Sequence, residues 1–209
     1  MRRILFQGDS ITDADRSREK DYKLGCGYPH LVEATLGFQA PGEYEFLNRG
    51  ISGNRIVDLY ARIKKDLINL APDVLSILIG VNDVWHEFGY QNGIDAEKFY
   101  KLYCMLIEEI KAALPEIRIM ILEPFVLDGP ALETYDAEAF KKEVALRAQM
   151  AKKVADEYGL TFVPLQKGFD ELSEKAPSTY WLRDGVHPTP KGHEYIKTQW
   201  LKAFQALEG

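Results

Sequence analysis

The sequence predicts an α/β fold, a doubly wound parallel sheet of five strands with helices on both faces. Two observations support this prediction. Short apolar runs alternate along the chain with longer segments in which apolar residues recur at helical spacing. The short runs are apolar almost throughout, which is typical of strands that are buried on both faces of a parallel sheet. A chain of 209 residues can bury a sizeable core, so we expect one domain over residues 1–209.

The individual elements follow from these patterns. The first strand is the apolar run that begins at Arg3 and ends at Gly8. The other strands are expected over residues 44–48, 74–79, 118–122 and 161–165. Helices are expected over residues 28–36, 56–70, 96–114, 137–158 and 191–207. Residues 123–136, which contain two prolines, are expected to form an irregular insertion.

Composition excludes several classes of function. The chain has 26 Lys and Arg against 32 Asp and Glu, a net charge of −6 without a basic block, which argues against nucleic acid or an anionic membrane as the main partner. It shows neither an apolar leader nor a run of ~18 apolar residues, so we expect a cytoplasmic protein without a membrane span. The two cysteines, Cys26 and Cys104, are expected to be reduced. No spacing of Cys or His fits a metal site, and we expect neither a metal nor a cofactor.

Polar residues follow three of the predicted strands. Ser10 follows the first strand, Gly53 the second and Asn82 the third. If these strands lie in the order 2-1-3, the loops after them meet at the switch point of the sheet, where ligands bind in open α/β folds. Asp184 and His187 lie in the last loop, just before the final helix, and can reach the same edge.

These residues are the parts that acyl transfer requires. A hydroxyl nucleophile, an imidazole base and an acid that orients the imidazole are the minimum set, together with donors for the oxyanion. Each part alone has an ordinary explanation as a turn or a helix cap. The prediction therefore depends on four signals that occur in order at four junctions. His30, His86 and His193 have no comparable placement, and we interpret them as ordinary polar residues.

The resemblance to a known family is specific at this point. The segments that carry it are Gly8-Asp9-Ser10, Ile51-Ser52-Gly53-Asn54, Gly80-Val81-Asn82-Asp83 and Asp184-Gly185-Val186-His187. They resemble the four blocks of the SGNH (GDSL-type) hydrolases, serine esterases with a flavodoxin-like sheet, and the likeness runs from residue 4 to about residue 201. It implies that Ser10 is the nucleophile, His187 the base and Asp184 the orienting acid. The implied oxyanion hole is made of the backbone N–H groups of Ser10 and Gly53 and the side-chain amide of Asn82.

Within that family the sequence is similar to bacterial acetylxylan esterases, which remove acetyl groups from xylo-oligosaccharides. The resemblance therefore implies a small acylated substrate, a carbohydrate ester, while assembly into a homo-oligomer is left open. One departure is Arg183, because those esterases carry an aromatic residue before the acid.

Further candidates for substrate contact lie near these loops. Trp85, Tyr180 and Trp181 could form an aromatic wall against a sugar ring or could simply pack the loops. Asp9, beside the nucleophile, is a weaker candidate. We expect Asn54 and Asp83 to hold the loops rather than to touch substrate.

Two alternative functions remain open. The first is an esterase, lysophospholipase or thioesterase that acts on longer acyl chains, and the second is a non-catalytic carbohydrate-binding protein. The nucleophile elbow of α/β-hydrolases, Gly-x-Ser-x-Gly, is not matched because Thr12 occupies the position of the second glycine. Ser17-x-x-Lys20 matches one motif of penicillin-binding proteins, but the other motifs of those proteins are absent. A metal-dependent phosphatase with Asp9 as nucleophile would need a carboxylate where Ile11 stands.

Overall fold

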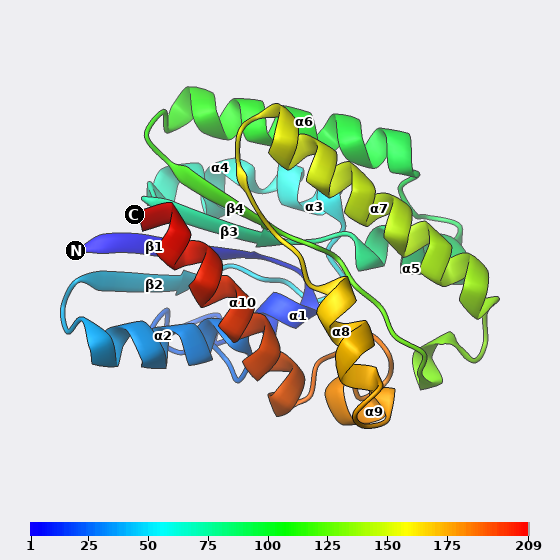
Figure 1. Ribbon diagram of the computed structural model, residues 1–209. Helices are drawn as coiled ribbons and strands as arrows, with labels where there is room; N and C mark the ends of the chain where they lie inside the picture. The colour runs from blue at the N-terminus through cyan, green and yellow to red at the C-terminus, as the bar shows by residue number, and fades with distance from the viewer. Residues whose placement is uncertain (209) are drawn as a thin grey trace.

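Five parallel strands form one sheet in the order β2-β1-β3-β4-β5 (Figure 1). The structure is a computed structural model that describes residues 1–208. The strands are β1 (Arg2–Gly8), β2 (Tyr44–Asn48), β3 (Val74–Leu78), β4 (Arg118–Leu122) and β5 (Thr161–Val163). The chain moves to one side of β1 to form β2 and then crosses to the other side to form β3. The first three strands therefore lie in the order 2-1-3, the condition under which their loops meet, and the switch point lies between β1 and β3.

Helices cover both faces of the sheet. The helical segments are α1 (Ser10–Asp13), α2 (Tyr28–Gln39), α3 (Ile56–Ala61), α4 (Ile63–Asp66), η1 (Ile68–Leu70), α5 (Val81–Tyr90), α6 (Ala96–Ala113), η2 (Pro130–Leu132), α7 (Ala137–Glu157), α8 (Gln166–Ser173), α9 (Ser178–Trp181) and α10 (Pro190–Glu208). In Figure 1, α2 and α10 lie on one face, while α3, α4 and α6 lie on the other. The five-stranded parallel sheet with helices on both sides is the predicted fold class.

Alternate residues of each strand supply two separate cores. Ile4 and Phe6 of β1 pack with α2 and α10, whereas Leu5 between them packs with α3 and α6. The same alternation continues through β3 and β4. Successive side chains of a strand point to opposite faces, so a strand between two helical layers must be apolar on both sides. The largest buried side chain of the first core, Trp200 of α10, donates its indole N–H to Ser76 Oγ of β3 at 2.9 Å.

The prediction of a single helix over residues 56–70 is wrong. It consists of three pieces, α3, α4 and η1, with a break at Arg62. There the guanidinium of Arg62 turns toward the loops after β1 and β2 and donates to the carbonyl of Arg49 at 2.8 Å and that of Gly8 at 3.3 Å. The break thus accompanies a contact between residues distant in sequence, which helical periodicity does not report.

Sequence patterns also missed four helices, α1, α5, α8 and α9, all next to the loops at the carboxyl edge of the sheet. The segment after β3 is not a simple turn, because α5 begins at Val81 and places Asn82 in its first turn. Gly80 precedes this helix with φ of +138°, a conformation that is open to glycine and strained for other residues. The other boundaries differ by a few residues: β3 ends at Leu78, β5 ends at Val163, and α10 begins at Pro190.

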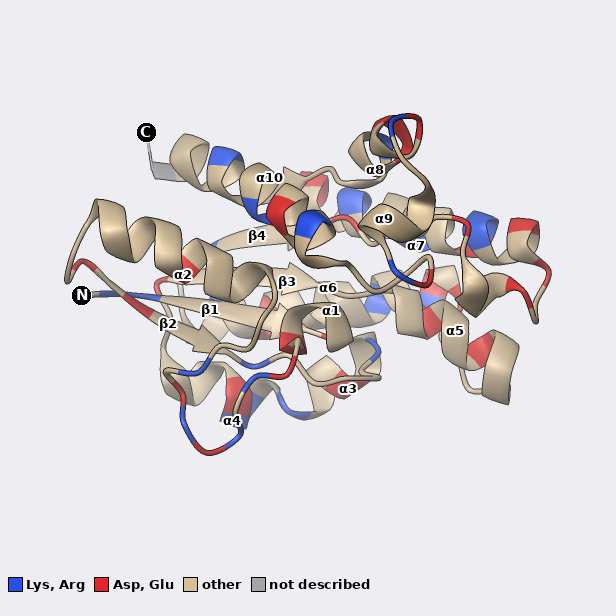
Figure 2. Ribbon diagram, turned by 90° about the horizontal axis from the view of Figure 1, so that it is seen from below, with Lys and Arg blue, Asp and Glu red and all other residues tan. Residues whose placement is uncertain are grey.

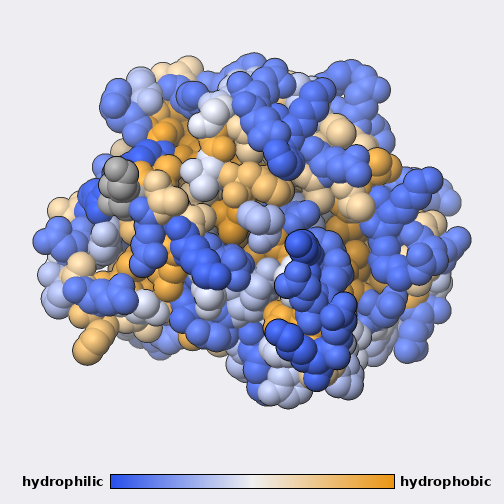
Figure 3. Space-filling view, in the orientation of Figure 1, coloured by the Kyte–Doolittle hydropathy of each residue, from blue (hydrophilic) through white to orange (hydrophobic). Residues whose placement is uncertain are grey.

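Charged side chains of both signs are interspersed on the outer helices, as Figure 2 shows for α7 and α10. On the face seen in Figure 3, hydrophilic side chains predominate and apolar ones form small patches between them. Among the helices of residues 1–208, none combines the length and the apolar character needed to cross a bilayer.

Candidate active site

The serine of the first loop is placed by the end of β1. A Cβ at Gly8 would overlap the carbonyl oxygen of Leu78 on the neighbouring strand, so β1 can end this close to β3 only with glycine. Asp9 then caps α1 by accepting a hydrogen bond from the N–H of Ile11 at 2.9 Å. Ser10 is the first residue of α1 and stands at the carboxyl end of the sheet, where ligands bind in open α/β folds.

The last loop brings an aspartate and a histidine to the same edge. Asp184 Oδ1 accepts hydrogen bonds from the backbone N–H groups of Val186 at 3.0 Å and His187 at 2.7 Å. Its other oxygen, Oδ2, lies 2.7 Å from His187 Nδ1. The opposite ring nitrogen, His187 Nε2, lies 3.0 Å from Ser10 Oγ. The three predicted residues therefore form one hydrogen-bonded line, Asp184–His187–Ser10.

Hydrogen bonds stabilise the ionised form of Asp184. Burial opposes its ionisation, but the hydrogen bonds from the His187 ring and from the two backbone N–H groups outweigh burial and lower its pKa to about 2. An ionised carboxylate against Nδ1 keeps the proton of the neutral imidazole on that nitrogen. The lone pair of Nε2 then faces the hydroxyl of Ser10.

The predicted donors come from the next two loops. Asn82 is only 6% exposed, and one N–H of its amide donates to the carbonyl of Asn54 at 3.1 Å. This bond places the Asn82 amide beside the loop that contains Gly53. Of the two hydrogens on Nδ2, one remains for another acceptor.

Buried polar residues hold these loops together. Asp83 accepts from the N–H of Ile56 with both carboxylate oxygens, at 3.1 and 3.2 Å. Asn54 Oδ1 accepts from Arg62 Nε at 2.8 Å. These contacts agree with the expectation that Asn54 and Asp83 hold the loops. The sequence patterns assigned no role to Asn48 at the end of β2, whose amide nitrogen donates to the carbonyl of Thr12 at 2.6 Å.

A cavity of about 370 Å³, termed here the Ser10 cavity, opens beside the line of three residues. Ser10 and His187 lie on its wall. The other lining residues are Asp13, Ala14, Asp15, Arg16, Arg18, Cys26, Ser52, Arg183, Pro188 and His193. Most of this wall is polar or charged. The arginines come from the loop after α1 and from the residue before Asp184, and the sequence patterns assigned none of them to substrate.

His193 is placed differently from its prediction as an ordinary polar residue. It lies in α10, is 6% exposed, and accepts a hydrogen bond from the N–H of Tyr28 on Nδ1 at 3.2 Å. Burial, together with the charges of Arg183 and His187, lowers its pKa to about 4. His193 is thus a neutral imidazole on the cavity wall, and no spacing in the sequence pointed to it.

The predicted aromatic wall is not assembled at the cavity. Trp85 lies near His187, with ring centroids 5.8 Å apart, and also packs edge-to-face on Phe140 at 6.2 Å. Tyr180 and Trp181 pack on one another, with centroids 4.9 Å apart, and Lys191 Nζ lies 4.9 Å from the Tyr180 ring centroid. None of the three aromatic residues lines the Ser10 cavity. Their contacts are those of residues that pack the loops.

Asp9 is likewise not on the cavity wall. Its side chain is 1% exposed, and Oδ2 is buried without a hydrogen-bond partner. Burial raises its pKa to about 7, although the hydrogen bond from Ile11 and the charge of His187 act in the opposite direction. The placement of Asp9 is that of a cap beneath Ser10 rather than of a group in contact with substrate.

Within residues 1–208, no group of three or more His, Cys, Asp or Glu side chains could hold a metal ion. Cys26 and Cys104 are both free thiols.

A serine, a histidine and an aspartate in one hydrogen-bonded line, beside donors at the edge of a parallel sheet, form the arrangement of a serine esterase. The chain belongs to the GDSL-like Lipase/Acylhydrolase family, whose model matches residues 6–195. It is a carboxylic ester hydrolase. The predicted family and enzyme class are confirmed.

Several relatives extend this result. The chain is 30% identical over 210 residues to an acetylxylan esterase of Geobacillus stearothermophilus, covering 96% of this chain and 92% of that protein. The crystal structure of that organism's acetylxylan esterase Axe2 gives a TM-score of 0.86 at 29% identity, over 97% of this chain and 93% of Axe2. A crystal structure from Parabacteroides merdae, described as a GDSL-like lipase, gives a TM-score of 0.89 at 37% identity, over 97% and 94% of the two chains. The solved forms of Axe2 include catalytic mutants in which a serine or an aspartate is replaced by alanine.

The raised pKa of Asp9 predicts how stability depends on pH. The folded-state pKa of Asp9, about 7, lies above the ordinary value of 3.8. The contribution of Asp9 to the free energy of unfolding is therefore fully present below pH 3.8 and is lost as pH rises through about 7. Asp9→Asn keeps the cap and cannot ionise. We expect the Tm of Asp9→Asn, relative to the unmodified protein, to rise by several degrees between pH 4 and pH 8, as measured by thermal unfolding.

Asp95 provides a matched control for Asp9. It also caps a helix, accepting from the N–H of Lys98, but this bond lowers its pKa and its side chain is exposed. The Tm of Asp95→Asn relative to the unmodified protein should therefore fall, not rise, as pH increases through the acidic range. A Tm difference for Asp9→Asn that is the same at every pH would show that Asp9 is not a buried titrating group.

Proposed function

We propose that this protein removes acetyl groups from acetylated carbohydrates through an acyl-enzyme on Ser10. The observation that carries the proposal is the line of hydrogen bonds from Asp184 through His187 to Ser10 Oγ, with both contacts at 3.0 Å or less. Membership of an esterase family and the likeness to acetylxylan esterases support it.

In the first step, His187 Nε2 takes the proton of Ser10 as Oγ attacks the ester carbonyl. The carboxylate of Asp184 stabilises the imidazolium that forms. The tetrahedral intermediate then collapses, and the C–O bond to the alcohol breaks as His187 gives its proton to the leaving oxygen. In the second half, His187 removes a proton from water as its oxygen attacks the acyl-enzyme. The bond between the acyl carbon and Ser10 Oγ then breaks, Oγ takes the proton back from His187, and acetate is released.

The oxyanion of each tetrahedral intermediate needs donors that are already in place. We assign this role to the backbone N–H groups of Ser10 and Gly53 and to the second N–H of the Asn82 amide. The contacts of Asn82 and Asp83 to residues 54 and 56 support the assignment, because they fix the two loops relative to one another. Donors held in this way need no reorganisation as charge develops.

The Ser10 cavity favours a short acyl group and a polar alcohol. Its volume of about 370 Å³ lies at the small end of ligand pockets, and its wall is mostly polar or charged. A long acyl chain would have to lie against arginine and aspartate side chains, which costs free energy unless they remain solvated. This argues against the lipid-type esterase, lysophospholipase and thioesterase alternatives.

Acyl-chain preference and the nucleophile can be tested together. We expect a larger kcat/KM for 4-nitrophenyl acetate than for the octanoate ester, and release of acetate from acetylated xylo-oligosaccharides. Ser10→Ala should lower kcat by about 10⁴–10⁶-fold, since the three residues act as a unit, while the Tm stays close to that of the unmodified protein.

Ser52→Ala is the matched control, because Ser52 is a second, exposed serine on the same cavity wall. It should retain most of the activity. A larger kcat/KM for octanoate would favour the lipid-type alternative, and an active Ser10→Ala protein would reject the acyl-enzyme mechanism.

Asn82→Ala tests the oxyanion assignment. Loss of one such donor costs about 10²–10³ in kcat, and the loss should appear in kcat far more than in KM because the bond strengthens as charge develops. Asn54→Ala is the control: it removes the acceptor of Arg62 and disturbs the same loop without removing the Asn82 donor. Two outcomes would reject the oxyanion role of Asn82 and leave it a role in holding the loop: equal losses of kcat in the two variants, or a large fall in Tm for Asn82→Ala with kcat retained.

A further inference from the structure

The wall of the Ser10 cavity carries three guanidinium groups, from Arg16, Arg18 and Arg183. The hydrolysis of a neutral ester does not require them. They share a wall with the nucleophile and its base, so what they bind must lie beside the reacting ester.

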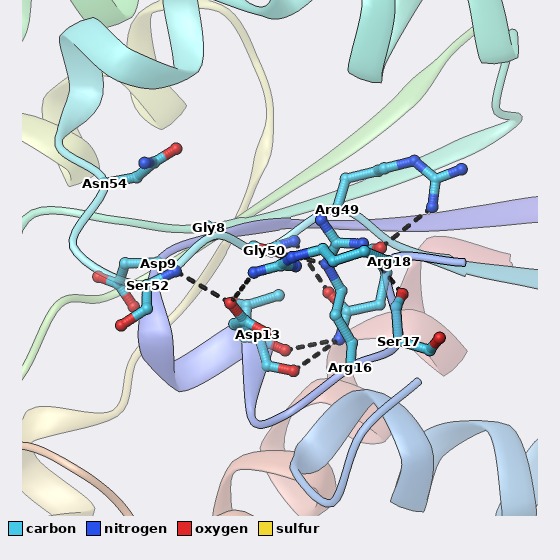
Figure 4. Close-up of polar contacts among 12 residues, drawn as sticks. Gly8, Asp9, Asp13, Arg16, Ser17, Arg18, Arg49, Gly50, Ser52 and Asn54 are labelled. Carbon is cyan, nitrogen blue, oxygen red and sulfur yellow. Dashed lines mark hydrogen bonds and ion pairs between the residues drawn. The ribbon is translucent and has the colours of Figure 1, made fainter. Parts of the chain in front are cut away.

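Arg16 and Arg18 are held close to one another. Arg16 Nε donates to the carbonyl of Gly50 at 2.7 Å, and Arg18 Nη1 donates to the same oxygen at 3.0 Å (Figure 4). Arg16 is half-buried and has no carboxylate within ion-pair distance among the described residues. Burial and the neighbouring charge of Arg18 lower its pKa to about 10. Arg16 is thus a half-buried guanidinium beside a second one, without an ion pair of its own among the described residues.

The acidic residues of the wall offset this charge only in part. Asp13 Oδ2 lies 2.5 Å from Arg18 Nη2 and also accepts from the N–H of Ser52 at 3.0 Å. Asp13 is therefore occupied by Arg18, which leaves Asp15 as the other carboxylate on the wall. Asp15 is exposed to solvent, where its charge is screened.

Arg183 is the third guanidinium on this wall, and it comes from the loop before α10, which also contains His187. Its side chain is exposed, and no group in residues 1–208 accepts a hydrogen bond from it. It lines the Ser10 cavity together with His193, and its charge adds to the effect of burial in lowering the pKa of His193. It stands immediately before Asp184, at the point where the sequence departs from the acetylxylan esterases that it resembles.

We propose that Arg183 and Arg16 bind an anionic group, a carboxylate or a phosphate, on the alcohol part of the substrate. This inference rests on the proposed function. The leaving oxygen takes its proton from His187 Nε2, so the alcohol part lies on the side of the loop that carries Arg183. Guanidinium groups match carboxylates and phosphates in geometry and form charge-assisted hydrogen bonds with them. The substrate class is therefore an acetylated acidic sugar, a uronate or a sugar phosphate.

The test compares three acetylated sugars of similar size: a neutral methyl xyloside, a methyl glucuronide and a glucose phosphate. We expect kcat/KM for at least one of the two anionic esters to exceed that for the neutral ester by about tenfold or more, as for one hydrogen bond to a charged group. Added salt should reduce this preference. Arg183→Gln should lower the ratio of anionic to neutral kcat/KM by about tenfold, chiefly through KM.

Lys175→Gln is the matched control. It removes the same charge from an exposed position in the segment before α9, outside the cavity, and should leave the ratio unchanged. Competitive inhibition of 4-nitrophenyl acetate hydrolysis by free glucuronate, glucose phosphate and xylose gives a second measurement that needs no acetylated sugar. The anions should inhibit at lower concentration than xylose, and Arg183→Gln should weaken that inhibition.

The uronate and phosphate arms separate the two sources of negative charge. Equal kcat/KM for neutral and anionic esters in the unmodified protein, or an unchanged ratio in Arg183→Gln, would overturn the anion site while leaving the esterase intact. Failure to hydrolyse 4-nitrophenyl acetate at all would instead reject the proposed function, and the anion site with it.

Discussion

The contact between Ser10 Oγ and His187 Nε2 joins two loops that are 177 residues apart in the chain. It depends on the position of β1 inside the sheet, between β2 and β3, because the loops after these strands and the loop before α10 then share one edge. The buried Asn48 supports this edge: its amide nitrogen donates to the carbonyls of Thr12 at 2.6 Å and Leu24 at 2.9 Å, and its oxygen accepts from the N–H of Gly50 at 2.9 Å. A buried amide satisfied in this way fixes the loop after β2 against the loop after β1.

The same edge combines two electrostatic environments. Around Asp184, hydrogen bonds favour the carboxylate and lower its pKa, whereas burial keeps Asp9, next to Ser10, in its neutral form at acidic pH. The neutral His193 and the charged Arg183 stand on the wall of the same cavity. The negative charge of Asp184 thus lies against the His187 imidazole. The positive charge of Arg183 lies on the side where we propose that the alcohol part of the substrate binds.

Much of this arrangement could be predicted from the sequence. Apolar runs that end in Gly, Asn or Asp residues place the loops after the first three strands at one edge, provided that the strand order is 2-1-3. The roles of Ser10, His187 and Asp184 come from the resemblance of their segments to the SGNH hydrolases. The break at Arg62, the start of α5 at Val81 and the position of His193 could not be predicted. Arg62 contacts Gly8 and His193 contacts Tyr28, residues that are far away in the sequence. The spacing of residues along one helix cannot predict contacts of this kind. The cavity arginines were visible as residues, but it is a property of the fold that Arg18 pairs with Asp13 while Arg16 and Arg183 have no carboxylate partner among residues 1–208.

The central claim is that Asp184 and His187 make Ser10 the nucleophile, and covalent labelling tests it most directly. A fluorophosphonate should add once per chain, on the peptide that contains Ser10. In Asp184→Asn, which leaves the imidazole without a carboxylate, labelling should be slower by orders of magnitude. Mass spectrometry of the digested adduct locates the label. Modification of Ser52 or Ser17 instead, or an Asp184→Asn protein that is labelled as fast as the unmodified one, would contradict the account.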